Sequence, residues 1–155
     1  MLKLLRAAVI AVALFLLADG LDLGPLDEGG RNGRARVVRV IDGDTVQLSG
    51  VGRVRLIGVD TPERGRCFED AATRFTRERI GGRRVRYALG EEDEDRYGRM
   101  LAYLYRRGGM HNLALVRRGY AETLTIPPTD RFAGRFRRAE RAARRTRAGR
   151  WGACR

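Results

Sequence analysis

Apolar residues recur along the chain at two different spacings, and each spacing predicts a different kind of element. Short alternating or continuous apolar runs that are bounded by turn residues are typical of β-strands. Asp42-Gly43 and Gly50-Val51-Gly52 separate the first three runs, and such turns are typical of hairpins. Three successive antiparallel strands are therefore predicted, and two more follow. The five runs are residues 37–41, 45–49, 53–59, 83–89 and 100–105.

Helical spacing occurs in three other segments. Residues 69–80 repeat apolar positions before a break at Gly81-Gly82, and Asn112 can cap a short helix that runs to Gly119. A third, Arg-rich helix carries an apolar stripe made of Phe132, Phe136, Ala139 and Ala143. The order of these elements predicts an α+β fold, in which three helices pack outside a five-stranded β-barrel.

The first twenty residues have the pattern of an export signal. A basic start precedes an unbroken apolar run over residues 7–18, and small residues follow at 18–20. Twelve helical residues cover roughly 18 Å, which is short of the roughly 30 Å hydrocarbon core. We therefore expect residues 1–20 to be a cleaved signal peptide, with a membrane tether through residues 4–18 as the alternative. Both arrangements place the domain outside the cytoplasm, either periplasmic or secreted.

The Gly-rich residues 21–35 show no apolar periodicity and predict a flexible linker. The folded domain is therefore expected to span residues 36–155 and to begin near Arg36.

The formal net charge is +13, carried by 31 Arg and one Lys against 19 acidic residues. Such an excess favours a polyanionic partner, either nucleic acid or an anionic membrane surface. A genome that prefers Arg codons would produce the same excess, because Arg is spread along the whole chain. Charge alone therefore does not identify the partner.

The small number of nucleophiles and soft ligands excludes several chemistries. The chain has one Ser, one His and two Cys. Ser49 lies in a turn signal, which argues against a Ser-His-Asp triad, and a zinc site would lack N and S ligands. Any metal should therefore be hard and bound by oxygen. We expect His111 at a turn without a catalytic role, and the acidic residues 91–95 in a solvated loop.

Three motifs follow one another on this framework: IDGDT at 41–45, VRLIGVDTPE at 54–63 and DRYGRMLAY at 95–103. Each is weak by itself, because Asp-Gly-Asp is an ordinary hairpin turn and a charged Thr-Pro turn ends many strands. Their order and spacing resemble the staphylococcal nuclease family, over about residues 36–152. The resemblance implies an OB-fold barrel that hydrolyses phosphodiester bonds with Ca²⁺ as its cofactor.

The resemblance also implies roles for individual residues of the first two motifs. Asp44 and Asp60 match the family's metal carboxylates, and Thr61 matches the residue that supplies a backbone carbonyl. Glu63 matches the proposed general base, which accepts a proton from the attacking water. Ca²⁺ suits this oxygen-only set, because its six to eight ligands can include waters and phosphate oxygens.

Arginines would hold the substrate. Arg55 and Arg99 match the family's two phosphate-binding arginines, and their planar forks suit bidentate contact with a phosphate. Without the neighbouring motifs, Arg55 would be one more solvated arginine on a two-sided strand. Arg96 and Tyr97 are expected to contact the terminal phosphate or the base.

One segment departs from the family pattern. Leu124 and Ile126 stand where aromatic residues would be expected to stack on the nucleotide. We therefore expect weaker stacking and a different substrate preference.

The two cysteines, Cys67 and Cys154, are expected to form a disulfide, because an even pair in an exported chain is more often bridged than free.

The combined interpretation is an exported, calcium-dependent nuclease that acts as a monomer on DNA or RNA. The alternative is a non-catalytic OB-fold nucleic-acid-binding protein at the cell envelope. Such a binder would need the basic surface but not the carboxylates, whose charge opposes a bound phosphate.

Overall fold

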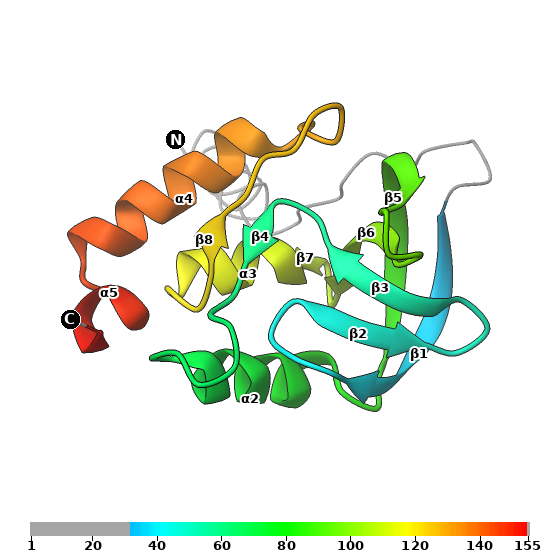
Figure 1. The fold of residues 1–155 in the computed structure, drawn as a ribbon, viewed down its shortest axis with the longest axis horizontal. Coiled ribbons are helices and arrows are strands. Elements are labelled where there is room, and N and C mark those ends of the chain that lie inside the picture. The colour runs from blue at the N-terminus through cyan, green and yellow to red at the C-terminus, as the bar shows by residue number, and fades with distance from the viewer. Residues whose placement is uncertain (1–31, 155) are drawn as a thin grey trace, which may run out of the picture.

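The computed structural model describes residues 32–154 and is shown in Figure 1. Its strands are β1 (Asn32–Val40), β2 (Thr45–Leu48), β3 (Gly52–Leu56), β4 (Val59–Asp60), β5 (Arg84–Glu94), β6 (Met100–Arg106), β7 (Gly109–Met110) and β8 (Glu122–Thr123). Its helices are α2 (Glu69–Ile80), α3 (His111–Arg117), α4 (Ala133–Arg145) and the single turn α5 (Arg150–Ala153). The predicted signal at 1–20 lies outside the described residues. None of the helices described is long and apolar enough to cross a membrane.

Five strands close into a barrel. β1 pairs antiparallel with β2 and β5, β2 pairs with β3, and β5 pairs with β6. A parallel pairing between β3 and β6 closes the ring. Alternate side chains of these strands fill the interior, among them Val37, Val46, Val54 and Leu104, all nearly or fully buried. This arrangement confirms the predicted five-stranded barrel, with α2, α3 and α4 outside it.

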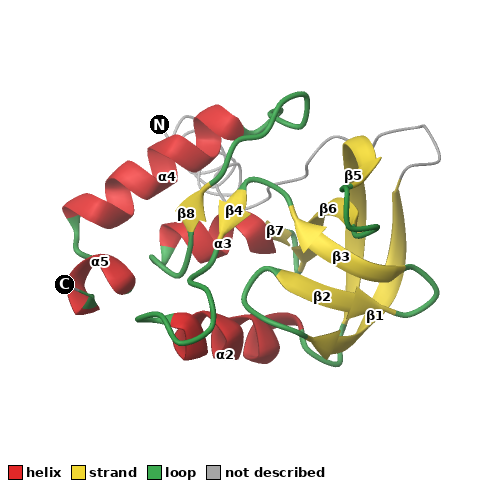
Figure 2. Ribbon diagram, viewed as in Figure 1, coloured by secondary structure: helices red, strands yellow, loops and turns green. Residues whose placement is uncertain are grey.

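The helices gather beside the barrel, and α3 lies between α2 and α4 (Figure 2). The predicted apolar stripe of α4 is confirmed, because Phe136, Ala139 and Ala143 are buried and Phe132 packs against the core. The opposite face of this helix carries exposed arginines. Helix α4 therefore covers the core with a narrow stripe and presents a basic face to solvent.

The predicted disulfide joins the C-terminus to the segment that precedes α2. The Cα atoms of Cys67 and Cys154 lie 5.9 Å apart, within the range that a bridge requires. An ion pair of 2.7 Å between Arg150 and Glu122 adds a second tie, from α5 to β8. Because β8 pairs with β4, the ion pair connects α5 to the strand that contains Asp60. The disulfide connects the C-terminus to the segment that follows Asp60.

The folded domain begins earlier than predicted. We expected a linker through residue 35, but Asn32–Arg36 pair with residues 84–88 of β5. Strand β5 also runs further than the apolar pattern indicates, to Glu94, so the acidic residues 91–94 form an exposed strand end rather than a loop. The partner strand determines both ends, and a pattern read along one strand does not show its partner.

The third predicted strand, residues 53–59, is divided in two. Strand β3 ends at Leu56, and β4 begins at Val59 and pairs with β8 instead. Gly58 lies between them at φ 80°, a backbone conformation that other residues rarely adopt. A Cβ at this position would lie 2.5 Å from the Phe136 ring. The close approach of α4 therefore requires glycine at the break.

Two predictions for α3 are wrong. Its N-cap is Met110, which makes no side-chain cap hydrogen bond, and Asn112 is buried inside the first turn. The Asn112 amide accepts a hydrogen bond from the Leu104 N–H and donates to the carbonyls of Ile57 and Ala102. His111 is fully buried and does not lie in a turn. Asn112 instead satisfies backbone groups where the barrel meets the helix, a need that the local sequence does not reveal.

Candidate active site

Two cavities meet on one side of the barrel, and Arg55 and Arg99 line both of them. The smaller one, which we call the acidic cavity, has a volume of about 330 Å³ and includes Asp42, Asp44, Asp60, Glu63 and Glu69. The larger one, the apolar cavity, has a volume of about 490 Å³ and includes Leu56, Ile57, Val59, Leu101, Leu124 and Ile126.

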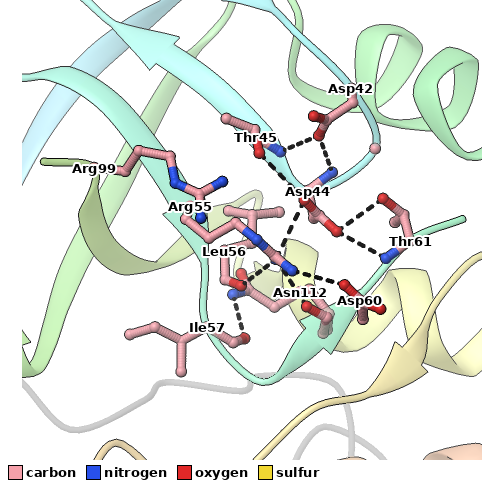
Figure 3. A network of polar contacts seen from close by, with 12 residues as sticks. Asp42, Asp44, Thr45, Arg55, Leu56, Ile57, Asp60, Thr61, Arg99 and Asn112 are labelled. Atoms are coloured by element: carbon pink, nitrogen blue, oxygen red, sulfur yellow. Dashed lines mark hydrogen bonds and ion pairs between the residues drawn. The ribbon is translucent and has the colours of Figure 1, made fainter. Parts of the chain in front are cut away.

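Asp44 is the most buried carboxylate of the acidic cavity, with 5% of its surface exposed. Its Oδ2 accepts hydrogen bonds from the Thr61 N–H at 2.7 Å and from the Thr61 hydroxyl at 2.8 Å. Its Oδ1 accepts from the Thr45 hydroxyl at 3.2 Å. Figure 3 shows these contacts between the loop after β1 and the residue after β4. The two predicted metal segments are therefore joined directly.

Burial raises the pKa of Asp44 to about 6, although the Arg55 guanidinium and the hydrogen bond from the Thr61 N–H oppose that rise. The nearby Asp42 raises it further. The carboxylate is thus a buried negative charge that its protein partners compensate only in part. A cation in the acidic cavity would favour the ionised form.

Arg55 bridges the acidic residues of two segments. Its Nη2 lies 2.9 Å from Asp60 Oδ1, and its Nη1 lies 3.2 Å from Asp44 Oδ1. Nη1 also donates to the carbonyls of Leu56 and Val59, at 3.0 and 2.8 Å. These contacts, drawn in Figure 3, hold the guanidinium where it lines both cavities. Asp60 itself remains accessible, since 52% of its side chain is exposed.

Arg99 is held by Asp95, the last of the acidic residues 91–95 for which the sequence predicts a solvated loop. Asp95 Oδ2 accepts from Nε of Arg99 at 2.7 Å, and Oδ1 accepts from the backbone N–H groups of Tyr97 and Arg99. Burial would raise the pKa of Asp95, but these hydrogen bonds outweigh it and hold the pKa below its usual value. An Asp at the start of a tight turn often bonds the N–H groups that follow, and this signal could have identified Asp95.

Buried side chains of α2 and α3 fix the position of the Asp42-Gly43-Asp44 turn, and the sequence did not suggest this role for them. The Thr76 hydroxyl donates to the Gly43 carbonyl at 2.6 Å and lies 3.2 Å from Nε2 of His111. A Cβ on Gly43 would lie 2.7 Å from the Thr61 side chain. The turn is thus fixed between Thr61 and α2. Burial, together with the charge of Arg79, lowers the pKa of His111 to about 3.

The other predicted site residues divide between the two cavities. Glu63 is exposed at the edge of the acidic cavity, in a segment closed by a 2.9 Å hydrogen bond from the Arg66 N–H to the Glu63 carbonyl. Arg96 and Tyr97 line the apolar cavity, where Tyr97 is 66% exposed and the centre of its ring lies 4.8 Å from the Arg96 guanidinium carbon.

The acidic cavity offers oxygen ligands for a metal. Its lining contains carboxylates and the hydroxyls of Thr45 and Thr61, and neither His nor Cys is among the lining residues. Within residues 32–154, no three His, Cys, Asp or Glu side chains lie close enough together to form a ready-made cage. This donor set fits a hard cation that also accepts carbonyl, water and phosphate oxygens.

The chain is similar to known nucleases over most of its length. The family described as "Staphylococcal nuclease homologue" matches residues 53–153. The chain is 34% identical to a thermonuclease of Staphylococcus intermedius, over 96% of this chain and 94% of that protein. It is 29% identical to a thermonuclease of Staphylococcus hyicus, over 94% of this chain and 92% of that protein. An uncharacterized endonuclease of Escherichia coli O157:H7 is 37% identical over 56% of this chain and 58% of its own length. The chain therefore belongs to the staphylococcal nuclease family and is a nuclease.

Proposed function

We propose that this nuclease is exported, depends on Ca²⁺, and cleaves phosphodiester bonds by attack of water with Glu63 as the general base. The observation that carries the proposal is the meeting of the acidic and apolar cavities at Arg55 and Arg99. A nucleotide likewise has two parts, an anionic phosphate that would bind the arginines and a flat, largely apolar base that would fit the apolar cavity. The junction therefore suits a phosphate whose base lies in the apolar cavity.

Asp44 and Asp60 would hold the ion through carboxylate oxygens, and the Thr61 carbonyl would complete the protein's share of the ligands. The partly compensated charge of Asp44 supports this assignment, as does the exposure of Asp60. When bound, Ca²⁺ supplies positive charge beside a phosphate oxygen and so favours the charge that develops during attack. The contact between Thr61 and Asp44 keeps the two ligand segments together before any ion arrives.

Arg55 and Arg99 would bind the phosphate that is attacked. Asp95 takes Nε and Nη2 of Arg99, and Nη1 has no partner among residues 32–154. A guanidinium that is already oriented loses little side-chain freedom when it binds an anion, so more of the contact energy remains for the transition state. The carboxylates thus position both arginines and do not merely neutralise them.

Glu63 would accept the proton of the attacking water. Its exposed position at the edge of the acidic cavity keeps the carboxylate solvated, close to the phosphate junction but outside the buried contacts of Asp44. A base in this position acts mainly as the proton leaves water, in the transition state. Removing it should therefore lower kcat much more than it changes substrate binding.

The apolar cavity would receive the base. Tyr97 provides an aromatic face, while Leu124 and Ile126 provide aliphatic contact where relatives were expected to stack tyrosines. Leu124 is 39% exposed and Ile126 is 59% exposed. This lining supports sequence-tolerant binding of single-stranded DNA or RNA.

Export is supported by the N-terminal pattern and by the Cys67–Cys154 disulfide, since such bonds persist in oxidising compartments. A cleaved signal gives a periplasmic or secreted protein, and an uncleaved one gives a protein tethered through residues 4–18. The protein is expected to work as a monomer.

The test is hydrolysis of single-stranded DNA, double-stranded DNA and RNA by the purified protein, in Ca²⁺ and in excess chelator. We expect cleavage of at least one polymer in Ca²⁺, loss of cleavage in chelator, and recovery when Ca²⁺ is restored. Equal rates in Ca²⁺ and in chelator would contradict the proposed calcium dependence.

A further inference from the structure

Three arginines from different elements converge at the end of α2 that is remote from the acidic cavity. We call Arg79, Arg106 and Arg118 the arginine cluster. Glu69, at the start of α2, lines the acidic cavity, and Arg79 follows ten residues later. At 1.5 Å per residue, the two positions are about 15 Å apart along the helix axis. The cluster is therefore separate from the site described above.

Packing brings these arginines together. A Cβ on Gly109 would lie 3.3 Å from Nη2 of Arg79, so Arg79 rests on the hairpin formed by β6 and β7. In that hairpin, Gly109 pairs directly with Arg106. The Arg118 guanidinium lies 5.7 Å from the centre of the Phe75 ring, and Phe75 is one helical turn before Arg79. Helix α2, the hairpin and the end of α3 thus place three cations at one location.

Within residues 32–154, no carboxylate forms an ion pair with any of these three arginines. The arginines that bind carboxylates at short distance in this part of the chain include Arg55, Arg99, Arg144 and Arg150, all outside the cluster. Nε of Arg79 is buried without a hydrogen-bond partner in that part of the chain. Burial lowers the pKa of Arg79, and the charges of Arg118 and Arg106 lower it further. Burial also lowers the pKa of Arg106, and Arg107 and Arg83 add to that effect.

Like charges held together without a counter-ion raise the free energy of the folded protein. A phosphate placed among them would remove that repulsion and accept charge-assisted hydrogen bonds from planar guanidinium groups. The cluster is partly open to such a ligand, because Arg106 is half-buried and Arg118 is exposed.

We propose that the arginine cluster is a second phosphate-binding site, which holds a remote part of the nucleic-acid strand while the acidic cavity cleaves it. The proposal rests on the proposed nuclease function. At about 3.4 Å per nucleotide in a duplex strand, a span of about 15 Å requires on the order of five nucleotides. A dinucleotide occupies only the acidic and apolar cavities, whereas a long strand reaches the cluster as well. The cluster therefore lowers KM for long substrates and leaves the rate of the chemical step unchanged.

The test compares a 30-nucleotide single-stranded DNA with a dinucleotide phosphodiester. The variant is Arg106→Gln/Arg118→Gln in the full protein. The matched control is Arg137→Gln/Arg141→Gln, which removes the same charge from two exposed positions of α4 that form no ion pair in the described part of the chain. The measurements are kcat and KM in Ca²⁺, and 30-mer binding in chelator over a range of salt concentrations. Unfolding curves verify that each variant is folded.

We expect the cluster variant to raise KM for the 30-mer about tenfold, as the loss of about two phosphate contacts implies, and to leave the dinucleotide kcat/KM unchanged. The salt dependence of 30-mer binding, plotted as log K against log salt, should become shallower by about 1.4, at about 0.7 per lost single-strand contact. The control should change KM for the 30-mer by less than twofold. If the double variant does not fold, Arg118→Gln and Arg137→Gln form the same comparison.

Three results would overturn the proposal. One is equal loss of 30-mer binding in the cluster variant and the control, which would mean general charge attraction. Another is a matching loss on the dinucleotide, which would place the effect in the catalytic cavities. The third is unchanged 30-mer binding by the cluster variant. In that case, weaker binding of the same variant to anionic lipid vesicles would make the partner a membrane. Absence of dinucleotide cleavage by the unaltered protein would instead count against the proposed function.

Discussion

The acidic cavity and the arginine cluster lie at opposite ends of α2 and use arginine in opposite ways. In the acidic cavity, Arg55 lies 2.9 Å from an Asp60 oxygen, and Arg99 lies 2.7 Å from an Asp95 oxygen. In the cluster, the arginines meet no carboxylate of the described chain, and their neighbouring cations lower the pKa of Arg79. The first arrangement fixes the orientation of a guanidinium, and the second leaves charge available for an external anion.

The arginines that give the chain its net charge of +13 therefore fall into two groups, those paired with carboxylates and those without such a partner. A paired, oriented arginine can stabilise a transition state, because little reorganisation is needed when charge develops. An unpaired, partly exposed arginine attracts and retains a polyanion, and its contribution depends on salt. We therefore expect changes in the acidic cavity to affect kcat, and changes in the cluster to affect KM for long substrates.

Removal of the disulfide should produce the largest change in stability. The Cys67–Cys154 bond closes a loop of about 88 residues, and the chain-entropy model assigns it about 4 to 5 kcal/mol. We expect Cys67→Ser/Cys154→Ser to lower the free energy of unfolding by up to that amount, as measured in urea. Reduction of the unaltered protein should have the same effect. An unchanged urea midpoint in both experiments would contradict the prediction.

The disulfide also distinguishes the two regions. Cys67 follows Glu63 by four residues, so loss of the bond should loosen the segment that carries the base. When the Cys67→Ser/Cys154→Ser variant is heated, we expect it to lose dinucleotide cleavage at a lower temperature than 30-mer binding. Simultaneous loss of both would mean that the bond stabilises the whole domain without favouring the acidic cavity.

Arg55→Lys should cost about 3 to 4 kcal/mol of transition-state stabilisation, the scale of a lost charged donor. Lysine keeps the charge, but it cannot bond Asp60 and the two carbonyls at once as the planar fork does. Arg53→Lys is the matched control, because Arg53 is exposed on the same strand. The measurement is kcat/KM on the dinucleotide, and similar values for the two variants would remove Arg55 from the catalytic arrangement.

His111 should make the protein sensitive to acid, because its pKa is about 3 in the folded state and about 6.5 when unfolded. Below pH 6.5 the unfolded chain binds a proton that the folded chain does not, so stability falls by about 1.4 kcal/mol per pH unit. Asp44 acts in the opposite direction between about pH 6 and 4, since folding raises its pKa to about 6 from an ordinary value of 3.8. The two effects largely offset each other there.

His111→Gln removes the first effect and leaves the second. Between pH 7 and pH 4, measured by urea unfolding in chelator, the variant should gain about 3 kcal/mol relative to the unaltered protein. Parallel pH profiles for the two proteins would show that His111 is not held neutral.

Leu124→Tyr should have the smallest effect and should restore a base stack in the apolar cavity. A stacked base is worth about 1 to 3 kcal/mol, and an exposed position should recover the lower part of that range. We expect a lower KM for the dinucleotide with little change in kcat, and an unchanged dependence on strand length. A KM that does not fall would mean that residue 124 does not face the base.

The sequence predicted those parts of the molecule that depend on local pattern. The barrel strands, helix α2 and the α4 stripe follow apolar periodicity, and the motif spacing brought Asp44, Arg55, Asp60 and Glu63 to one cavity. It missed residues whose role is set by partners distant in sequence. Thr76 acts on Gly43 across 33 positions, and Asn112 acts on Ile57 across 55.

The same reason explains why the strand ends and the arginine cluster were not predicted. Asn32 and Glu94 extend their strands only because the neighbouring strands accept them. Arg79, Arg106 and Arg118 are ordinary members of an Arg-rich chain until α2, the β6–β7 hairpin and α3 pack together. The sequence shows how many charges are present, and the fold determines which of them have partners.

We propose above that the acidic cavity performs the chemistry with Glu63 as its base. The most direct test is steady-state cleavage of the dinucleotide in Ca²⁺ by the unaltered protein, Glu63→Gln and the control Asp70→Asn, an exposed carboxylate outside both cavities. We predict that Glu63→Gln lowers kcat by about 10² to 10⁴ with KM nearly unchanged, and that Asp70→Asn stays within twofold of the unaltered enzyme. Near-normal kcat for Glu63→Gln, in a folded protein that still requires Ca²⁺, would contradict the claim.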